Sequence, residues 1–166
     1  MAVPHEHRVH APASVRCGVI TISDSRTEAT DDSGRLIREM LAHAGHTVAY
    51  TAIVKDEPPA IAAAVEAASR PCDAIITNGG TGFATRDVTI PTIAPALDRT
   101  MPGFGELFRA LSFEAIGSAA MLSGALAGVY RGRFLVCLPG SPDACRLAME
   151  RLILRELPHV VGLLRR

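Results

Sequence analysis

The chain has 166 residues, 48% of them hydrophobic, which suits a single domain with a sizeable core. Its 17 basic and 17 acidic side chains balance, so no overall field attracts nucleic acid or a membrane surface, and any anion site has to be local. No segment reaches the uncharged apolar length that spans a bilayer, so we expect a soluble, cytoplasmic protein.

The N-terminal residues 1–14 are polar and contain Pro4, Pro12 and three histidines, which predicts a disordered tail rather than a metal site. Residues 15–166 are predicted to form a single folded domain. The cysteines include no Cys-x-x-Cys pair, so we expect buried free thiols in a reducing cytosol and no zinc site.

The first half of this domain alternates apolar runs with amphipathic segments. Continuous apolar runs are typical of parallel strands that helices cover on both faces, and apolar side chains at helical spacing predict the helices between them. The predicted strands cover residues 16–23, 46–54 and 74–77, and the predicted helices begin at Ser33 and after Asp56. This order predicts an α/β fold: a three-layer, doubly wound, mostly parallel sheet with helices on both faces.

The second half contains helices and shorter strands in mixed order. We predict a short helix at 91–97, a longer helix at 103–116, two short strands at 119–123 and 125–130 around a turn at Gly124, and a buried strand at 133–138. The last helix begins at Ser141, a suitable N-cap, with Pro142 at the first helical position. Pro158 is expected to end that helix.

A glycine-rich turn, Asn78–Gly82, follows the third strand, and Arg86-Asp87 comes soon after it. Glycines let backbone N–H groups approach an anion, Arg86 adds a fixed positive charge, and Asp87 can hold a magnesium ion. This order of features is the layout of a phosphate site at the carboxyl end of a parallel strand. A tight turn without a ligand is the alternative, because the stretch is neither a Walker A motif nor a dinucleotide fingerprint.

Other polar loops follow strands and converge on the same edge of the predicted sheet. They contain Ser23-Asp24 after the first strand, Ser33 at the next helix start, Asp56 after the second strand, and Gly140-Ser141-Pro142 after the last strand. Each group alone could be a helix cap or a turn, so the predicted ligand crevice depends on their convergence. No histidine lies in these loops and Ser141 has no evident base, which favours transfer by positioning and electrostatics over covalent catalysis.

Several of these segments match one known family in a single register, from about residue 15 to residue 162. On them the chain resembles the MoaB/MogA proteins of molybdenum cofactor biosynthesis, most closely the MoaB branch. Each short segment alone is unspecific, whereas the combination is highly specific. The segments are Thr21–Asp24, Asp32–Gly34, Val54–Glu57, Gly79–Gly82, Arg86–Thr89, Pro102–Arg109, Ile116–Gly117 and Leu138–Pro142.

The resemblance implies trimers, often paired into hexamers, that bind molybdopterin and interact with other proteins of cofactor assembly. In active members it implies adenylylation of molybdopterin by ATP with Mg²⁺, with release of pyrophosphate. Asp56 and Asp87 match the family's two essential acidic positions and would act in catalysis and magnesium binding. The residues implied in binding molybdopterin or nucleotide are Ser23, Asp24, Ser33, Gly79, Gly80, Thr81, Gly82, Arg86, Gly140, Ser141 and Pro142.

Two departures from the family pattern keep other functions open. Ile90-Pro91 stands where the family usually has Pro-Glu, so a carboxylate is lost, and Gly124 stands where an arginine is common. A molybdopterin-binding or scaffold protein without turnover is therefore the alternative to an adenylyltransferase. An unrelated enzyme for a phosphorylated ligand, built on the same sheet architecture, is a third interpretation.

Overall fold

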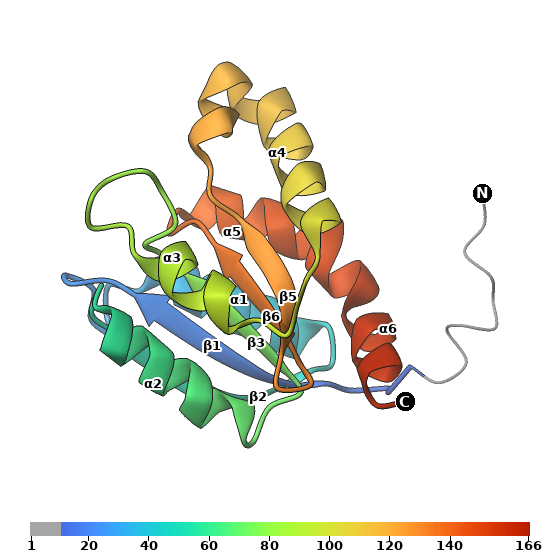
Figure 1. The fold of residues 1–166 in the computed structure, drawn as a ribbon. Coiled ribbons are helices and arrows are strands. Elements are labelled where there is room, and N and C mark those ends of the chain that lie inside the picture. The colour runs from blue at the N-terminus through green and yellow to red at the C-terminus, as the bar shows by residue number, and fades with distance from the viewer. Residues whose placement is uncertain (1–10) are drawn as a thin grey trace.

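The computed structural model describes residues 11–166, and a six-stranded sheet forms its centre (Figure 1). The strands are β1 (Arg16–Ile22), β2 (Thr47–Val54), β3 (Ala74–Asn78), β4 (Arg99–Thr100), β5 (Leu126–Tyr130) and β6 (Arg133–Leu138). They lie in the order β2-β1-β3-β6-β5-β4; β5 is antiparallel to both β6 and β4, and the other pairs in this sheet are parallel. The predicted mostly parallel sheet is confirmed. Residues 1–10 of the predicted tail lie outside the described residues.

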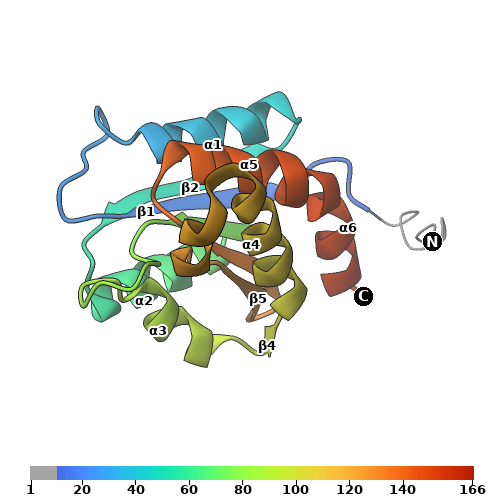
Figure 2. The ribbon, with the colours of Figure 1, turned by 90° about the horizontal axis from the view of Figure 1, so that it is seen from above.

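Helices cover both faces of the sheet, so the predicted three-layer architecture is also confirmed (Figure 2). One face carries α1 (Asp32–His43), α4 (Pro102–Ile116), α5 (Pro142–Ala148) and α6 (Leu154–Leu164), and the other carries α2 (Pro58–Ser69) and α3 (Thr89–Ile93). Successive side chains of β1 alternate between the two cores, with Val19 in the first and Ile20 in the second. This double burial explains why the central strands are continuous apolar runs.

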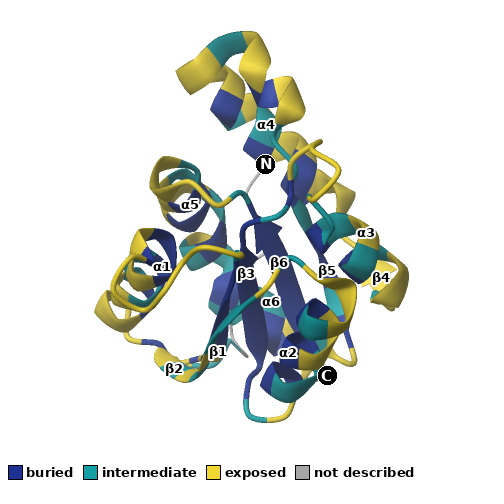
Figure 3. Cartoon of the chain, turned by 90° about the vertical axis from the view of Figure 1, so that its left-hand side faces the viewer, coloured by how far each residue is buried: buried dark blue, intermediate teal, exposed yellow. Residues whose placement is uncertain are grey.

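An arm formed by Pro102–Leu122 projects from the sheet (Figure 3). It consists of α4 and the 3-10 helix Gly117–Leu122. The arm is anchored at its start, where Phe104 and Phe108 are buried with their rings stacked at a centroid distance of 6.4 Å. Along its length the arm also carries large apolar side chains that are more than half exposed. They are Leu107, Phe113, Ile116, Met121 and Leu122.

The predicted strand at residues 119–123 is wrong. The 3-10 helix occupies this segment, because it continues from α4 in the arm, away from the sheet, where no strand is available for pairing. Gly117, at φ +63°, ends α4 and turns the chain into this helix. The neighbour of β5 at the sheet edge is instead the two-residue strand β4, which was not predicted.

The expectation that Pro158 ends the last helix is also wrong, because α6 runs through it. A proline in a helix interior removes one hydrogen bond and costs about 3 kcal/mol or more. Leu157 and Val161 are buried in the core, and each buried aliphatic side chain contributes about 1.5–3 kcal/mol, so packing offsets this loss. A π-helical turn, Met149–Ile153, widens the helix just before α6.

At the amino ends of the central strands, a buried carboxylate connects three strands with the C-terminal helix. Asp73 precedes β3, and its carboxylate pairs with Arg16 at 3.2 Å, Arg133 at 3.9 Å and Arg165 at 3.0 Å. Burial alone would raise the pKa of this carboxyl, but hydrogen bonds from Arg16 and Arg165 reverse the effect and hold the pKa at about 2. Ionised Asp73 therefore stabilises the folded state.

We predict that Asp73→Asn lowers the free energy of unfolding by about 2 kcal/mol at pH 7. The folded pKa is depressed, so the contribution is present above the unfolded value of about 3.9 and is lost as the pH falls towards 2. Urea unfolding of both proteins from neutral to acid pH measures the difference. The matched control is Asp98→Asn, at an exposed carboxylate, which should change little. A difference that does not shrink in acid would contradict this role.

Candidate functional site

The carboxyl ends of β1, β3 and β6 meet the amino end of α1 at the edge of the sheet where a crevice was predicted. A cavity of about 70 Å³ lies there, well below the roughly 300–1,000 Å³ of small-molecule pockets, so only part of a ligand fits inside it. The lining residues are Thr21, Ile22, Ser23, Arg26, Asp31, Ser33, Asn78, Gly79 and Gly140. The structure thus brings the predicted residues Ser23, Ser33, Gly79 and Gly140 together.

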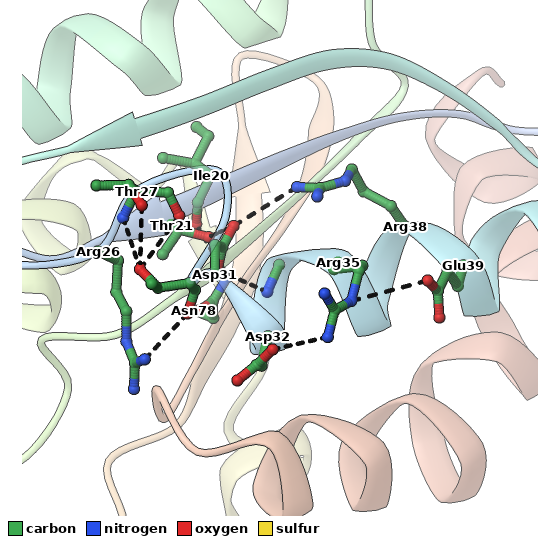
Figure 4. Close-up of polar contacts among 12 residues, drawn as sticks. Ile20, Thr21, Arg26, Thr27, Asp31, Asp32, Arg35, Arg38, Glu39 and Asn78 are labelled. Atoms are coloured by element: carbon green, nitrogen blue, oxygen red, sulfur yellow. Dashed lines mark hydrogen bonds and ion pairs between the residues drawn. The ribbon is translucent and has the colours of Figure 1, made fainter.

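Asp31 organises a buried polar network in the cavity wall (Figure 4). One of its carboxylate oxygens accepts the Gly34 N–H at 2.9 Å, and the other accepts the Thr21 hydroxyl at 2.9 Å. The Asn78 amide donates to the Thr21 hydroxyl at 3.0 Å, and Arg38 forms an ion pair with Asp31 at 3.5 Å. The network therefore joins the ends of β1 and β3 to the start of α1.

Close backbone contacts bring the turns after β3 and β6 together. Gly79 has φ +99°, and a side-chain carbon there would overlap the carbonyl oxygen of Ile22. The Gly79 N–H donates to the Leu138 carbonyl at 3.0 Å, and a side-chain carbon on Gly140 would lie 3.3 Å from Gly79 Cα. The Ser33 hydroxyl donates to the Gly140 carbonyl at 2.8 Å, which attaches the start of α1 to these two turns.

The glycine loop after β3 presents free backbone donors. The Gly80 carbonyl accepts the Thr89 N–H at 3.0 Å, and the Thr89 hydroxyl donates to the Gly79 carbonyl at 2.8 Å. These bonds use carbonyl groups of the loop, whereas the N–H groups of Gly80, Thr81 and Gly82 have no acceptor in the part of the chain that is described. Consecutive free N–H groups in a turn are a common means of binding an anion. Gly79 allows the close backbone contact with Ile22, but its N–H is bonded to the Leu138 carbonyl of β6 and is not available to a ligand.

Charged side chains from three loops meet beside the glycine loop. Arg86 pairs with Asp24, which follows β1. The other Asp24 oxygen accepts the backbone N–H of Asp56, which follows β2, at 3.3 Å. Burial raises the pKa of Asp56 above its usual value; repulsion from Asp24 adds to the rise, and Arg86 opposes it. The structure thus brings the predicted Asp24, Asp56 and Arg86 together.

Asp56 and Asp87, the predicted magnesium ligands, both lie against the glycine loop. A side-chain carbon on Gly80 would lie 2.7 Å from an Asp56 oxygen, and one on Gly82 would lie 2.7 Å from an Asp87 oxygen. Among residues 11–166, no group of three or more His, Cys, Asp or Glu side chains is arranged to hold a metal ion. Two carboxylates beside free backbone donors nevertheless fit Mg²⁺, which takes its remaining ligands from phosphates and water.

Ser141 and Pro142 lie apart from the small cavity, although they directly follow Gly140. Ser141 caps α5 by accepting the Ala144 N–H at 3.3 Å, and Pro142 occupies the first helical position. Ser141 lines a different, mainly apolar hollow of about 390 Å³ between the arm and α5. Of the three residues predicted in this turn, Gly140 is the one that lines the small cavity.

The two departures from the family pattern contact each other and the glycine loop. A side-chain carbon on Gly124 would overlap the Thr81 carbonyl oxygen and would lie 3.0 Å from Ile90 Cδ1. Gly124 connects the arm to β5, so its lack of a side chain lets this connection lie against the loop. An arginine at position 124 does not fit this arrangement.

Thr21, Arg26, Asp31 and Asn78 each line the cavity, although no binding role was predicted for any of them. Asn78 was predicted only as the first residue of the glycine-rich turn, and Asp31 only as part of the polar loop before the helix at Ser33. Thr21 and Asn78 are buried polar residues at the carboxyl ends of otherwise apolar strands. Their position was the sequence signal that could have identified them as site residues, because a buried polar group needs a hydrogen-bond partner. Asp31 caps α1 by accepting the Gly34 N–H, and it also accepts the Thr21 hydroxyl.

Residues 18–159 match the family described as "Probable molybdopterin binding domain". The chain is 52% identical over 159 residues to molybdenum cofactor biosynthesis protein B of Halalkalibacterium halodurans, covering 94% of each chain. It is 50% identical over 164 residues to the protein of that name from Bacillus subtilis, covering 97% of this chain and 96% of the relative.

Solved structures agree with these relatives. A crystal structure of molybdenum cofactor biosynthesis protein B, 50% identical, matches with a TM-score of 0.91 over 94% of this chain and 99% of that chain. The tungsten cofactor synthesizing protein MoaB from Pyrococcus furiosus, 38% identical, matches with a TM-score of 0.85 over 94% of this chain and 100% of that chain.

The fold and the site thus define a protein of the molybdopterin-binding domain family. Within it, the chain belongs to the family of molybdenum cofactor biosynthesis protein B, MoaB, which confirms the resemblance drawn from the motifs. No helix in the described residues is long and apolar enough to cross a membrane.

We predict that Gly79→Ala destabilises the fold more than Gly45→Ala does. Both glycines have positive φ, which costs another residue about 1–2 kcal/mol, but Gly45 faces open space whereas Gly79 is pressed against the Ile22 carbonyl. We expect losses of about 1 kcal/mol for Gly45→Ala and more than about 2 kcal/mol for Gly79→Ala. Urea unfolding followed by circular dichroism measures both. Equal losses would show that the close approach is not a constraint.

Proposed function

We propose that this protein binds molybdopterin and adenylylates it with Mg-ATP, releasing pyrophosphate. Membership of the MoaB family supports a role in molybdenum cofactor biosynthesis. The observation that carries the proposal is the position of Asp56 and Asp87 against a loop whose backbone donors are free. Such an arrangement suits phosphate-bearing substrates together with a divalent cation.

The cysteine thiols are buried and protonated, which agrees with direct transfer between two substrates without a protein nucleophile. All four cysteines are buried, and burial raises the pKa of Cys72 to about 11 and those of Cys17, Cys137 and Cys145 to about 12. They are protonated at neutral pH, whereas a nucleophilic cysteine has to be an accessible thiolate. On the proposal no protein nucleophile is needed. The terminal phosphate of molybdopterin attacks the α-phosphorus of ATP, one P–O bond forms, another breaks, and pyrophosphate leaves.

The residues of the site divide into two tasks on this proposal. The free N–H groups of the glycine loop and the Arg86 guanidinium bind phosphate oxygens, and Asp24 holds Arg86 in place. Asp56 and Asp87 would hold Mg²⁺, which neutralises phosphate charge when bound. Catalysis then comes from orienting the two phosphates and stabilising their charge rather than from covalent chemistry.

We predict that Asp87→Asn lowers molybdopterin-dependent pyrophosphate release about 100-fold or more, because a neutral amide is a much weaker ligand than a carboxylate for the Mg²⁺ that Asp87 would hold. The loop should survive, since an asparagine oxygen can still accept the Ala84 N–H that Asp87 accepts at 2.7 Å. Pyrophosphate release from purified protein with molybdopterin, ATP and Mg²⁺ is the measurement. Asp98→Asn, at an exposed carboxylate on the far edge of the sheet, is the control and should retain full activity. Undiminished turnover in Asp87→Asn would refute the role of Asp87.

A molybdopterin-binding protein without turnover is the second candidate. The contact between Ile90 and Gly124 favours it, because the chain lacks both the carboxylate and the arginine that the family pattern has there. The same assay separates the two functions. Tight binding of molybdopterin by the wild-type protein, without any pyrophosphate release, would decide for binding alone.

We further propose that the arm mediates assembly into trimers, as the resemblance implies. Its exposed apolar side chains form a patch of the kind that marks a protein interface. A mainly apolar hollow of about 450 Å³ beside its base, lined in part by Met101, Leu107 and Val160, supplies a surface that a neighbouring chain can fill.

We predict that Ile116→Asp breaks this assembly into smaller units, because a carboxylate is costly to bury in an apolar interface. Light scattering coupled to size-exclusion chromatography measures the mass. Leu163→Asp, at an exposed leucine near the end of α6, is the matched control and should leave the mass unchanged. A wild-type monomer at micromolar concentration, or an Ile116→Asp variant of wild-type mass, is the outcome against the proposal.

A further inference from the structure

A large aromatic side chain is exposed on the loop that carries the free backbone donors. Phe83 is 82% exposed, more than any other large hydrophobic residue in the described chain. It directly follows Gly82, one of the residues whose N–H groups have no acceptor in residues 11–166. The loop leads from β3 to α3 and projects from the sheet (Figure 1). Neither phosphate binding nor Mg²⁺ binding uses the ring of Phe83.

Hydrogen bonds hold the loop on both sides of Phe83. Before it, the Gly80 carbonyl accepts the Thr89 N–H at 3.0 Å. After it, the Ala84 N–H donates to the Asp87 carboxylate at 2.7 Å, and the Asp87 N–H donates to the Ala84 carbonyl at 2.9 Å. The ring is therefore attached to a backbone that is constrained relative to the phosphate donors and to Asp87.

The ring of Phe83 has no aromatic partner within the protein. The stacked pair in residues 11–166 is Phe104 with Phe108, and no ring of the described chain covers Phe83. A phenyl ring that stays in water forgoes the stabilisation of burial. A flat ring also has two faces on which other planar rings stack, and such stacking strengthens binding about 5- to 150-fold for each base. A ligand with a planar ring would use the surface that Phe83 leaves open.

We propose that Phe83 stacks on the planar heterocycle of a substrate whose phosphate is held by the glycine loop. The inference rests on the proposed function, because ATP and molybdopterin each carry a phosphate joined through a short linker to a flat, nitrogen-containing ring. Consecutive Cα atoms lie about 3.8 Å apart, so Phe83 begins one residue beyond the Gly82 donor. Phe83 is thus a positioning residue, which orients the substrate without touching the atoms that react.

The surroundings of Phe83 suit a small ligand better than a protein partner. Its neighbours along the loop are small or polar: Gly82, Ala84, Thr85 and Arg86. Protein interfaces usually bury a contiguous apolar patch rather than one ring. Arg86 carries a positive charge on the same loop, which favours a ligand with phosphate groups.

A fluorescent reporter tests the stacking directly. The chain contains no tryptophan, so Phe83→Trp places a single one at the proposed position. ATP and molybdopterin are added separately, each with Mg²⁺. Quenching by ATP assigns the stacking to adenine, and quenching by molybdopterin assigns it to the pterin. Inorganic tripolyphosphate, which has no ring, should leave the emission unchanged.

The matched control is Leu163→Trp, at an exposed leucine near the end of α6, and its emission should respond to neither substrate. Emission of Phe83→Trp that changes with neither substrate would overturn the proposal. Equal quenching by tripolyphosphate and ATP, without quenching by molybdopterin, would also overturn it, because the phosphates alone would then cause the change.

Isothermal titration calorimetry gives an independent readout. Phe83→Leu stays apolar but has no ring face, so the Kd of the ring-bearing substrate should rise about tenfold, whereas the Kd of tripolyphosphate should not change. Phe83→Tyr keeps a ring and should keep the wild-type affinity. A residue that merely supported the loop would weaken the binding of tripolyphosphate equally. That result, or an unchanged affinity of Phe83→Leu for both substrates, counts against the stacking.

These binding measurements separate the role of Phe83 from the proposed function. If the wild-type protein binds a substrate without releasing pyrophosphate, and Phe83→Leu binds it more weakly, adenylyl transfer fails and the stacking stands. If the wild-type protein releases pyrophosphate and Phe83→Leu binds both substrates normally, the function stands and the stacking fails. A wild-type protein that binds neither ATP nor molybdopterin overturns both.

Discussion

The close packing of backbone around Gly79 is the constraint on which the site depends. Gly79 lies between the Ile22 carbonyl and Gly140, where no side chain fits. This approach lets β3 turn sharply at positive φ, so that the following N–H groups leave the sheet ladder and become available to a ligand. The hydrogen bond from Ser33 to Gly140 attaches the start of α1 to the same backbone contact. A side chain at Gly79 would separate β1 from β3 and displace the loop that the site requires.

The parallel core could be predicted from the sequence because double burial produces apolar runs that local composition reveals. The errors fall where tertiary context outweighs local preference. Residues 119–123 have a strand-like composition, but the arm carries them away from any partner strand. Pro158 breaks an isolated helix, but Leu157 and Val161 hold it against the core. Neither the missing partner nor the compensating burial can be read from a short window of sequence.

The site was predictable where polar residues follow strands, and less so where they lie within them. Asp24, Asp56 and Arg86 lie in loops that follow parallel strands, and such loops meet at the same edge of the sheet. Thr21 and Asn78 belong to apolar strands, and their importance appears only through the shared bond between them. Ser141 follows Gly140 directly, yet capping α5 turns it away from the cavity. Adjacency in sequence does not determine on which side of a turn a side chain lies.

The two family departures, Ile90 and Gly124, lie against each other beside the glycine loop. An arginine at position 124 would overlap the Thr81 carbonyl, so the backbone there would have to move to admit it. Relative to the family pattern, the site loses one carboxylate and one arginine, and its net charge is therefore unchanged. Asp56, Asp87 and the free N–H groups of the glycine loop are all retained. These are the groups that adenylyl transfer would use, and the departures lie in the wall between the arm and the loop.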